Sequence, residues 1–288
     1  MAVQSVGNLA FHAVLGRLLP VDGYGALGAI LAAMVMLGVP LGALQAAAST
    51  LAAGEGARAT TTRVLRDVGT WSALPAGALA LATPAVAGYF HLGSALDAAA
   101  LAPYLVVAAM LAAARGLLLG SGAVGAVAGT YLVGTVARMV VGLGLASWYG
   151  VGGALAGTLL GEAVSLAVAV GWLLRPDQRP HLRPTGPAGS AGPAGSAGPT
   201  GAGTPVGAGT PVGGSAAVGR LRLRTVARSA VAVTGLFLLS TVDLLLARHH
   251  LRGADSGGYV AAATVAKTVL ALPAAVMSAV LPRLVAAW

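Results

Sequence analysis

The residues of this chain that could carry chemistry are charged side chains inside long apolar stretches. An ionisable group there costs about 2.5–3.5 kcal/mol to insert into a membrane, so each one needs a partner or a function. The candidates for contact with a substrate are Arg17, Arg138, Asp243 and Lys267. The chemistry open to them is charge pairing, either with one another or with a charged substrate.

Arg138 and Glu162 fall at similar depths in consecutive apolar stretches. They lie about 15 and about 12 residues from the same end of their stretches, so their depths differ by ~5 Å. A structural ion pair between adjacent helices is the favoured interpretation, and a substrate-facing role is the alternative. Arg115 lies nearer the end of its own stretch, where its long side chain is expected to reach the membrane surface; a functional role is the alternative.

Four other charged residues belong to two related segments. Arg17 and Arg248 occupy equivalent outer ends, where each either anchors a helix end or has a functional role. Asp243 and Lys267 lie on consecutive stretches and either pair with each other or line a central cavity. Their depths do not match closely, so the cavity is favoured. Pro40 and Pro273 interrupt long apolar runs and are predicted hinges, because proline removes a helical hydrogen bond.

No motif in the sequence indicates an enzyme. The sequence has no Walker loop, nucleophile elbow or zinc-ligand spacing, and it has no cysteine. His249 and His250 are adjacent and so point in different directions, and they are interpreted as loop residues. We therefore expect no catalytic residue, no metal and no cofactor.

The composition is that of a membrane protein. Only 9% of residues are charged and 57% are hydrophobic, whereas soluble domains average roughly 25% charged. The net charge of +9 does not indicate nucleic acid, because the arginines lie between apolar stretches and not along an aromatic-lined groove. Membrane lipids are therefore the expected surroundings. The N-terminus lacks a basic leader, so its first apolar stretch is not interpreted as a signal peptide.

A helix needs about 20 apolar residues to cross a bilayer. Eight stretches approach that length, at residues 2–19, 24–51, 68–90, 99–120, 123–147, 151–174, 226–247 and 257–281. We therefore predict an all-α polytopic helix bundle of about eight transmembrane helices. Glycines recur at every fourth position in spans five and six, a spacing typical of close helix packing. They are Gly125 and Gly129, and Gly153, Gly157 and Gly161.

One pattern occurs twice. Leu15-Gly16-Arg17 is followed by Gly23-Tyr24, and Leu246-Ala247-Arg248 by Gly258-Tyr259, each before a long apolar run. Duplicated helix pairs are typical of transporters built from repeated halves. Arginines gather between spans two and three and between spans six and seven. The positive-inside rule then places the N-terminus in the cytoplasm of a cell-membrane protein and makes the two repeats parallel.

These patterns predict three regions. Residues 1–175 form a six-helix N-terminal lobe. Residues 176–224 form a Gly/Pro/Ala-rich linker, expected to be disordered and cytoplasmic because its composition cannot build a core. Residues 225–288 form the first two helices of an incomplete C-terminal lobe.

Several motifs resemble one family of transporters. Asn8 through Gln45, with Arg-Leu-Leu-Pro, Tyr-Gly and Val-Pro-Leu-Gly-Ala-Leu-Gln, resembles the opening helices of a branch of the multidrug/oligosaccharidyl-lipid/polysaccharide exporter superfamily, the polysaccharide flippases. Thr241 through Arg248, with Gly258-Tyr259 and Leu281-Pro282-Arg283, resembles the start of that family's second lobe. Arg115 through Gly120 resembles its fourth helix.

The resemblance implies two six-helix lobes around a cavity that opens alternately to each side. It implies a polyprenyl-pyrophosphate-linked oligosaccharide as substrate, flipped to the outer leaflet for cell-surface polysaccharide synthesis. Arg17, Arg138 and Lys267 would suit the pyrophosphate, because arginine and lysine both bind phosphate groups. A whole second lobe needs helices beyond Trp288, so a missing C-terminal portion is expected.

Three alternatives remain open. The first is a cation-coupled multidrug exporter, which the sequence favours less because Glu162 is the one carboxylate within the first six spans. The second is a flippase for lipid-linked peptidoglycan precursor, which sequence hardly separates from the preferred function. The third, from another class, is an inactive truncated membrane protein.

Overall fold

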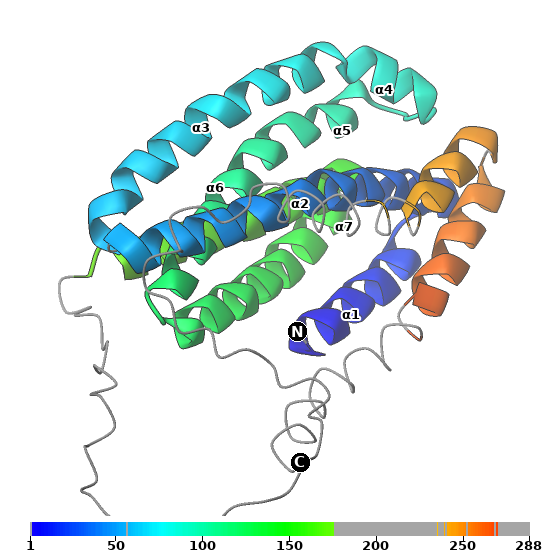
Figure 1. The fold of residues 1–288 in the computed structure, drawn as a ribbon. Helices are drawn as coiled ribbons and strands as arrows, with labels where there is room; N and C mark the ends of the chain where they lie inside the picture. Colours follow the sequence, from blue (N-terminus) through cyan, green and yellow to red (C-terminus); the bar gives the residue numbers. More distant parts are fainter. Residues whose placement is uncertain are drawn as a thin grey trace, which may run out of the picture.

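The computed structural model describes residues 2–55, 57–175, 241–251 and 253–267, together with Gly235, Leu239 and Val269. In these residues the chain is all helical, with no strand, which confirms the predicted fold class (Figure 1). Pro273, the linker at 176–224 and large parts of the last two predicted spans lie outside the described residues.

Seven helices form the N-terminal part, and two shorter helical segments follow at 241–250 and 254–267. The seven are α1 Ala2–Leu18, α2 Val21–Glu55, α3 Ala57–Leu81, α4 Thr83–Tyr89, α5 Ala95–Ala99, α6 Leu101–Gly120 and α7 Val124–Leu173. Among the described residues, three helices are long and apolar enough to cross a membrane, or four if the bent pair α3–α4 counts as one span. The chain is thus a multi-pass membrane protein.

The third predicted span, 68–90, is broken in the structure. α3 ends at Leu81 and α4 begins at Thr83, with a bend of 55° between them. Pro84 occupies one of the first two positions of α4. Proline there cannot donate the hydrogen bond that would continue α3, but it is well suited to starting a new helix.

α7 is two helices joined by a sharp reversal at Gly150, which has φ 60° and ψ −132°. A side chain added at Gly153 would meet the backbone of Leu145, and one at Gly157 would meet the backbone of Gly142. Residues after the turn thus lie against residues before it, in reverse order. The two halves form an antiparallel hairpin, in agreement with the predicted spans 123–147 and 151–174.

Only some of the glycines that were predicted to pack closely against another helix do so. Gly153, Gly157 and Gly161 all lie against the backbone of the first half of α7, which confirms that seam. The expectation for Gly125 and Gly129 is not met within the described part of the chain, where no atom lies within 4 Å of a Cβ added at either position. Four-residue spacing places small residues on one face of a helix, but it does not say whether a neighbour covers that face.

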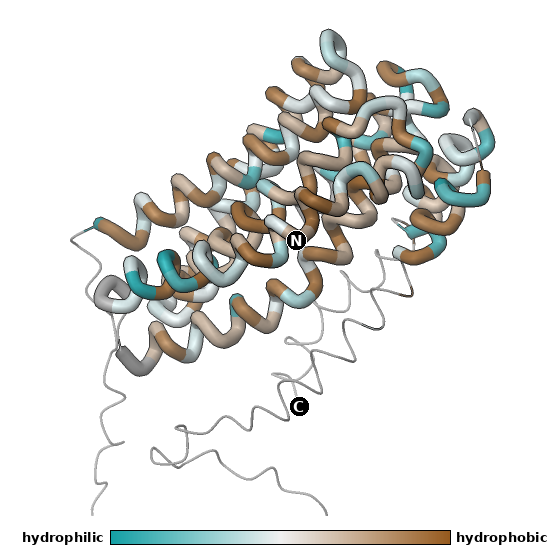
Figure 2. The backbone as a smooth tube through the Cα atoms, turned by 90° about the horizontal axis from the view of Figure 1, so that it is seen from above, coloured by the Kyte–Doolittle hydropathy of each residue, from teal (hydrophilic) through white to brown (hydrophobic). Residues whose placement is uncertain are grey.

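A second glycine seam joins α6 to α2. A Cβ at Gly116 would overlap the carbonyl of Gln45, and one at Gly120 would overlap the carbonyl of Ser49. α6 also packs against α3 and α7, so it occupies the centre of the bundle (Figure 1). Apolar residues run along the lengths of the helices, and many hydrophilic ones lie near the turns (Figure 2).

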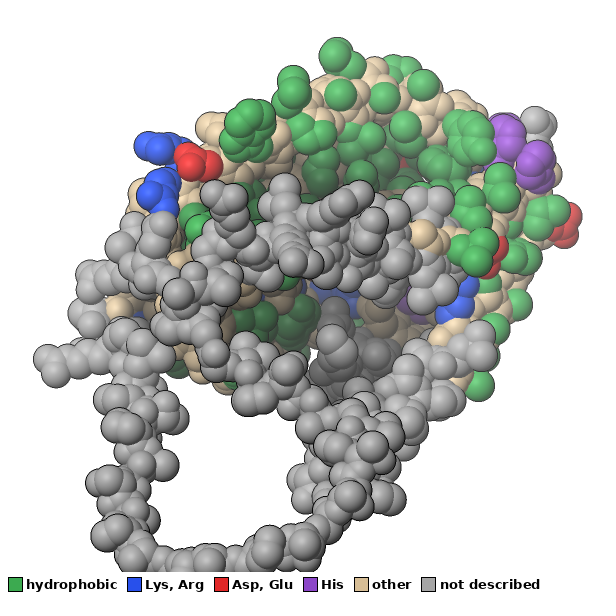
Figure 3. Space-filling view, viewed as in Figure 1, with side chains coloured by type: hydrophobic (Ala, Val, Ile, Leu, Met, Phe, Trp, Pro, Cys, Tyr) green, Lys and Arg blue, Asp and Glu red, His purple; other side chains and the backbone are tan. Residues whose placement is uncertain are grey.

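The bundle has two ends, which we name after charged residues. The ends of α1 and α4, the reversal at Gly150 and the end of the segment 241–250 lie at the Asp22 end. The end of α2, the turn between α6 and α7 and the end of α7 lie at the Arg66 end. One core cluster, around Phe11, Leu27 and Leu155, includes Leu244 and Val260 from the C-terminal helices. Figure 3 shows Lys and Arg side chains beside Asp or Glu near the start of α3, and His side chains at the opposite end.

Candidate functional site

A small polar cavity opens between α6 and the two halves of α7. Its volume is ≈ 20 Å³, room for about one water molecule. Its polar walls contrast with the apolar bundle around it. We name it the arginine pocket, and its lining residues are Arg115, Tyr131, Gly134, Thr135, Arg138, Thr158, Glu162 and Ser165.

Arg115 lines this pocket and is held by the first half of α7. Its Nε donates a hydrogen bond to Thr130 Oγ1 at 3.1 Å, and its guanidinium carbon lies 3.8 Å from the centroid of the Tyr131 ring. Such a cation–π contact stabilises a cation that is partly removed from water. The expectation that Arg115 extends to the membrane surface is therefore wrong.

Arg138 lies on the same wall, deeper along α7. Its Nη2 donates a hydrogen bond to Asn8 Oδ1 of α1, and its guanidinium carbon lies 4.9 Å from the centroid of the Phe11 ring. Its Nε is buried and has no hydrogen-bond partner among the described residues. Arg138 thus links α1 to α7, and its Nε–H group has no acceptor among the described residues.

The direct ion pair expected between Arg138 and Glu162 is not formed, since no contact within 4 Å joins these two described residues. Both line the arginine pocket, and their charges still attract through space. The similar depths were predicted correctly. The pair is absent because α1, which carries Asn8, takes one end of the guanidinium, and depth along a helix says nothing about which neighbour stands closest.

Asp243 and Lys267 form the ion pair that was the less favoured of their two interpretations. Lys267 Nζ lies 2.8 Å from Asp243 Oδ1, and the two side chains are 35% and 33% exposed. Tyr259 OH donates a hydrogen bond to the other carboxylate oxygen at 3.4 Å. The side chains face each other across the two C-terminal helices, because the long lysine side chain makes up the difference in depth.

The structure does not bring the four predicted substrate residues together. Arg138 lies in the arginine pocket, Asp243 and Lys267 pair on the C-terminal helices, and Arg17 is exposed in the last turn of α1. Pro40 is exposed inside α2, which remains helical from Val21 to Glu55. Its role as a hinge stays a prediction.

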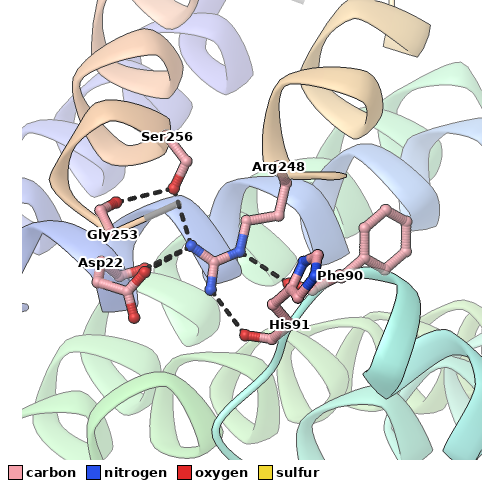
Figure 4. Close-up of polar contacts among 6 residues, drawn as sticks. All are labelled: Asp22, Phe90, His91, Arg248, Gly253 and Ser256. Carbon is pink, nitrogen blue, oxygen red and sulfur yellow. Dashed lines mark hydrogen bonds and ion pairs between the residues drawn. The ribbon is translucent and has the colours of Figure 1, made fainter. Parts of the chain in front are cut away.

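Arg248, which the sequence marks as the counterpart of Arg17 in the second repeat, is the centre of a second polar cluster. Its side chain is 2% exposed and makes five hydrogen bonds (Figure 4). Nη1 donates to Asp22 Oδ1 at 2.6 Å and to Ser256 Oγ at 2.8 Å. Nε donates to the Phe90 carbonyl at 2.9 Å and Nη2 to the His91 carbonyl at 3.0 Å. A third, longer contact from Nη1 reaches the Asp22 carbonyl at 3.4 Å.

The carbonyls that receive Arg248 belong to the end of α4. The N–H of His91 donates to the Gly88 carbonyl and that of Leu92 to the Ala87 carbonyl, the pattern of a Schellman cap. His91 has φ 49°, a left-handed conformation usually left to glycine. Next to this cap, His249 stacks on Tyr89 with ring centroids 4.1 Å apart.

The repeat contained the signal for this centre, but it was incomplete. Arg17 and Arg248 occupy equivalent positions, yet Arg17 is exposed while Arg248 is buried. Asp22 lies in the first turn of α2 and meets the arginine of the other repeat. A sequence repeat shows which residues of the two copies are equivalent. It does not show which residue of one copy contacts the other copy.

Glycines bring the two repeats into direct contact beside Arg248. A Cβ at Gly25 would overlap Ser256, one at Gly28 would overlap Val260, and one at Gly257 would overlap Val21. The start of α2 therefore packs against its repeat counterpart, the helix at 254–267.

No family model matches this chain, and no curated protein matches it either. Two solved structures are similar. One is described as the inward-facing conformation of a multidrug resistance MATE family transporter of the MOP superfamily. Its TM-score is 0.56 at 18% identity, and the match covers 94% of this chain and 59% of that one.

The other is a MOP superfamily transporter from Pyrococcus furiosus, described as having a binding pocket of reverse polarity that suggests a different function. Its TM-score is 0.51 at 18% identity, and the match covers 86% of this chain and 51% of that one. The present chain thus spans between half and six-tenths of the length of these two proteins. At this identity the likeness establishes a shared fold.

Proposed function

We propose that this chain forms part of a membrane transporter of the MOP type that flips polyprenyl-pyrophosphate-linked oligosaccharide across the membrane by alternating access. The observation that carries the proposal is the arginine pocket, where Arg115 and Arg138 stand against the single carboxylate of Glu162. A net positive pocket inside an apolar bundle suits an anionic head group, because arginine binds phosphate in a bidentate fork.

The uncommitted donor of Arg138 supports this role. A buried guanidinium nitrogen without a partner loses the stabilisation that water would give it, so such groups are uncommon unless something else binds them. A phosphate oxygen is a suitable acceptor. The cavity as it stands is small, so binding a head group requires the surrounding helices to move apart.

The orientation is part of the proposal. We place the Arg66 end in the cytoplasm, because arginines gather there, and the Asp22 end outside. The contacts between the two repeats lie at the Asp22 end, as expected for a transporter closed to the outside. One of the similar structures is described as inward-facing, and we propose the same state here.

The charge of the arginine pocket also helps to distinguish between the alternative substrates. For one similar structure, the polarity of the binding pocket was taken to suggest a different function. By the same logic, a pocket with two arginines and one carboxylate is poorly suited to a cationic drug. The lipid-linked peptidoglycan precursor shares the pyrophosphate, so the pocket suits it equally. Arg17 and the Asp243–Lys267 pair remain candidate contacts for the same substrate, outside the arginine pocket.

The experiment replaces each pocket arginine with glutamine and uses an arginine outside the pocket as a control. Arg115→Gln and Arg138→Gln should lower surface polysaccharide and raise the intracellular lipid-linked precursor, both per folded molecule. Arg138→Lys should recover part of the loss, since it restores charge without the fork. Arg66→Gln, at a side chain that is 72% exposed, should change neither quantity.

Two results would separate the alternatives. Unchanged export per folded molecule in both pocket variants would overturn the cationic-pocket proposal. Accumulation of peptidoglycan precursor, with surface polysaccharide at its normal level, would assign the pocket to that substrate instead. Arg17→Gln and Lys267→Gln, tested in the same way, show whether charged residues outside the arginine pocket contribute.

A further inference from the structure

We infer that Arg248 is a latch that holds the two repeats together at the Asp22 end and is released when that end opens. The inference rests on the proposed alternating access, but not on the identity of the substrate. Four of the five hydrogen bonds of Arg248 go to the N-terminal part of the chain, at Asp22, Phe90 and His91. One side chain thus supplies most of the described polar contact between the two parts.

The receiving site is built by the N-terminal part alone. The Schellman cap at the end of α4 turns the carbonyls of Phe90 and His91 toward one point, and Asp22 lies beside them (Figure 4). Carbonyls at a helix end carry partial negative charge and lack helical partners, so a cation is stabilised there. His91 adopts its left-handed conformation at this point, and strain of that kind is often found at functional sites.

The surroundings favour separation over permanent attachment. Asp22 is 58% exposed although its partner is 2% exposed, so the ion pair lies at the edge of water. When the repeats part, both charges can be hydrated, which removes the penalty that a broken pair suffers in a sealed core. The neighbouring contacts between the repeats pass through Gly25, Gly28 and Gly257.

The repeat offers an internal comparison. Arg17 stands at the position equivalent to Arg248, and it is exposed in the last turn of α1. Burial is therefore not a general property of arginine at this place in the repeat. The arginine of the second repeat is buried because it contacts the first repeat.

The test uses thiol labelling, because the natural chain has no cysteine. Val260 is 1% exposed and lies against Gly28, so Val260→Cys reports on opening of this interface. In membranes containing the full chain, a membrane-impermeant maleimide should label it slowly. Adding Arg248→Gln should raise the labelling rate by about tenfold or more, the effect of losing a hydrogen bond to a charged group. Asp22→Asn keeps an acceptor oxygen but removes its charge, so it should raise the rate by less.

The control is Arg66→Gln, which removes the same group at the other end of the bundle and should leave labelling of Val260→Cys unchanged. Arg248→Lys keeps the charge but cannot reach all four residues, so an intermediate rate is expected. Asp22→Asn keeps the shape of the site and serves if Arg248→Gln does not fold. Wild-type labelling rates in folded Asp22→Asn and Arg248→Lys proteins would overturn the inference.

Disulfide trapping gives a second, independent measurement. A Cβ at Gly28 lies 3.2 Å from the Cβ of Val260, close to the 3.5–4.5 Å typical of disulfides. The pair Gly28→Cys and Val260→Cys should cross-link readily, and Arg248→Gln should lower the yield several-fold. An equal yield in the folded variant would contradict the latch. Neither measurement needs a transported molecule, so failure of the polysaccharide assay alone leaves the latch standing with a different cargo.

Discussion

Arg138 on α7 donates a hydrogen bond to Asn8 on α1, a residue 130 positions earlier in the chain. The contact ties the first helix to the wall of the arginine pocket. It takes up one nitrogen of the guanidinium and leaves Nε, which is buried, for another partner. Asn8 is therefore the direct partner of Arg138, the role that the sequence analysis predicted for Glu162.

We expect Asn8→Ala to destabilise the protein more than Glu162→Gln. Asn8→Ala removes a hydrogen bond between helices, which is worth about 0.6–2 kcal/mol in membrane proteins. Glu162 makes no direct contact with Arg138, so its loss changes only a weaker attraction through space. Thermal unfolding in detergent of the singles, and of the doubles with Arg138→Gln, gives both coupling energies. A larger coupling between Arg138 and Glu162 would contradict this assignment.

Gly157→Ala should destabilise the α7 hairpin, whereas Gly125→Ala should not. A Cβ at Gly157 would overlap the backbone of Gly142, so the two helices must separate. Overpacking of this kind costs about 1–3 kcal/mol. No atom of the described residues lies within 4 Å of a Cβ at Gly125, so alanine there should stabilise by up to about 1 kcal/mol through its better helix propensity. The midpoint of thermal unfolding in detergent measures both changes.

Asp243 and Lys267 should show mutual dependence. Asp243→Asn or Lys267→Gln alone leaves an unpaired charge, while the double variant leaves none and should be milder than the worse single variant. We expect about 1–3 kcal/mol of coupling, less than for a sealed pair because both side chains are about one-third exposed.

The matched control for that pair is Arg66 and Asp67. Their side chains are 72% and 50% exposed at 3.3 Å separation, and exposed pairs contribute about 0–1 kcal/mol. Coupling no larger in Asp243–Lys267 than in this surface pair would show that the inner pair has no special role.

The two ends of the bundle should differ in their access to the outside. Thr62→Cys lies near the Arg66 end and Leu96→Cys near the Asp22 end, and both side chains are exposed. In intact cells an impermeant maleimide should label Leu96→Cys alone, and in permeabilised cells it should label both. Labelling of Thr62→Cys in intact cells would reverse the topology proposed from the arginines.

Much of the fold could be predicted from the sequence, because apolar length is a local property. The stretches at 24–51 and 99–120 correspond to α2 and α6, and the reversal at Gly150 falls between two predicted spans. The break at Leu81 was missed because proline within an apolar run is compatible with either a bend or a new helix. The difference depends on the packing of α3 and α4.

The site was less predictable, because charge pairing depends on which faces meet. Sequence placed Arg138 and Glu162 at one depth and around what proved to be one pocket, but it could not show that α1 would supply Asn8. The four-residue spacing of Gly116 and Gly120 is the sequence signal for the α2–α6 seam. The sequence showed Arg248 only as the counterpart of Arg17 in the repeat. Its partners could not be predicted, because Asp22, Phe90 and His91 come from distant segments.

The glycine seams also limit where a lipid tail can travel. At Gly157 the two halves of α7 touch through their backbones, and at Gly116 and Gly120 α6 touches α2 in the same way. A methylene chain needs about 4 Å of clearance from its neighbours, and neither seam provides it. If the cargo is a polyprenyl lipid, its hydrocarbon chain must stay in the bilayer on the outer side of these seams. The head group alone then crosses, so the length of the polyprenyl chain should matter little to the rate of flipping.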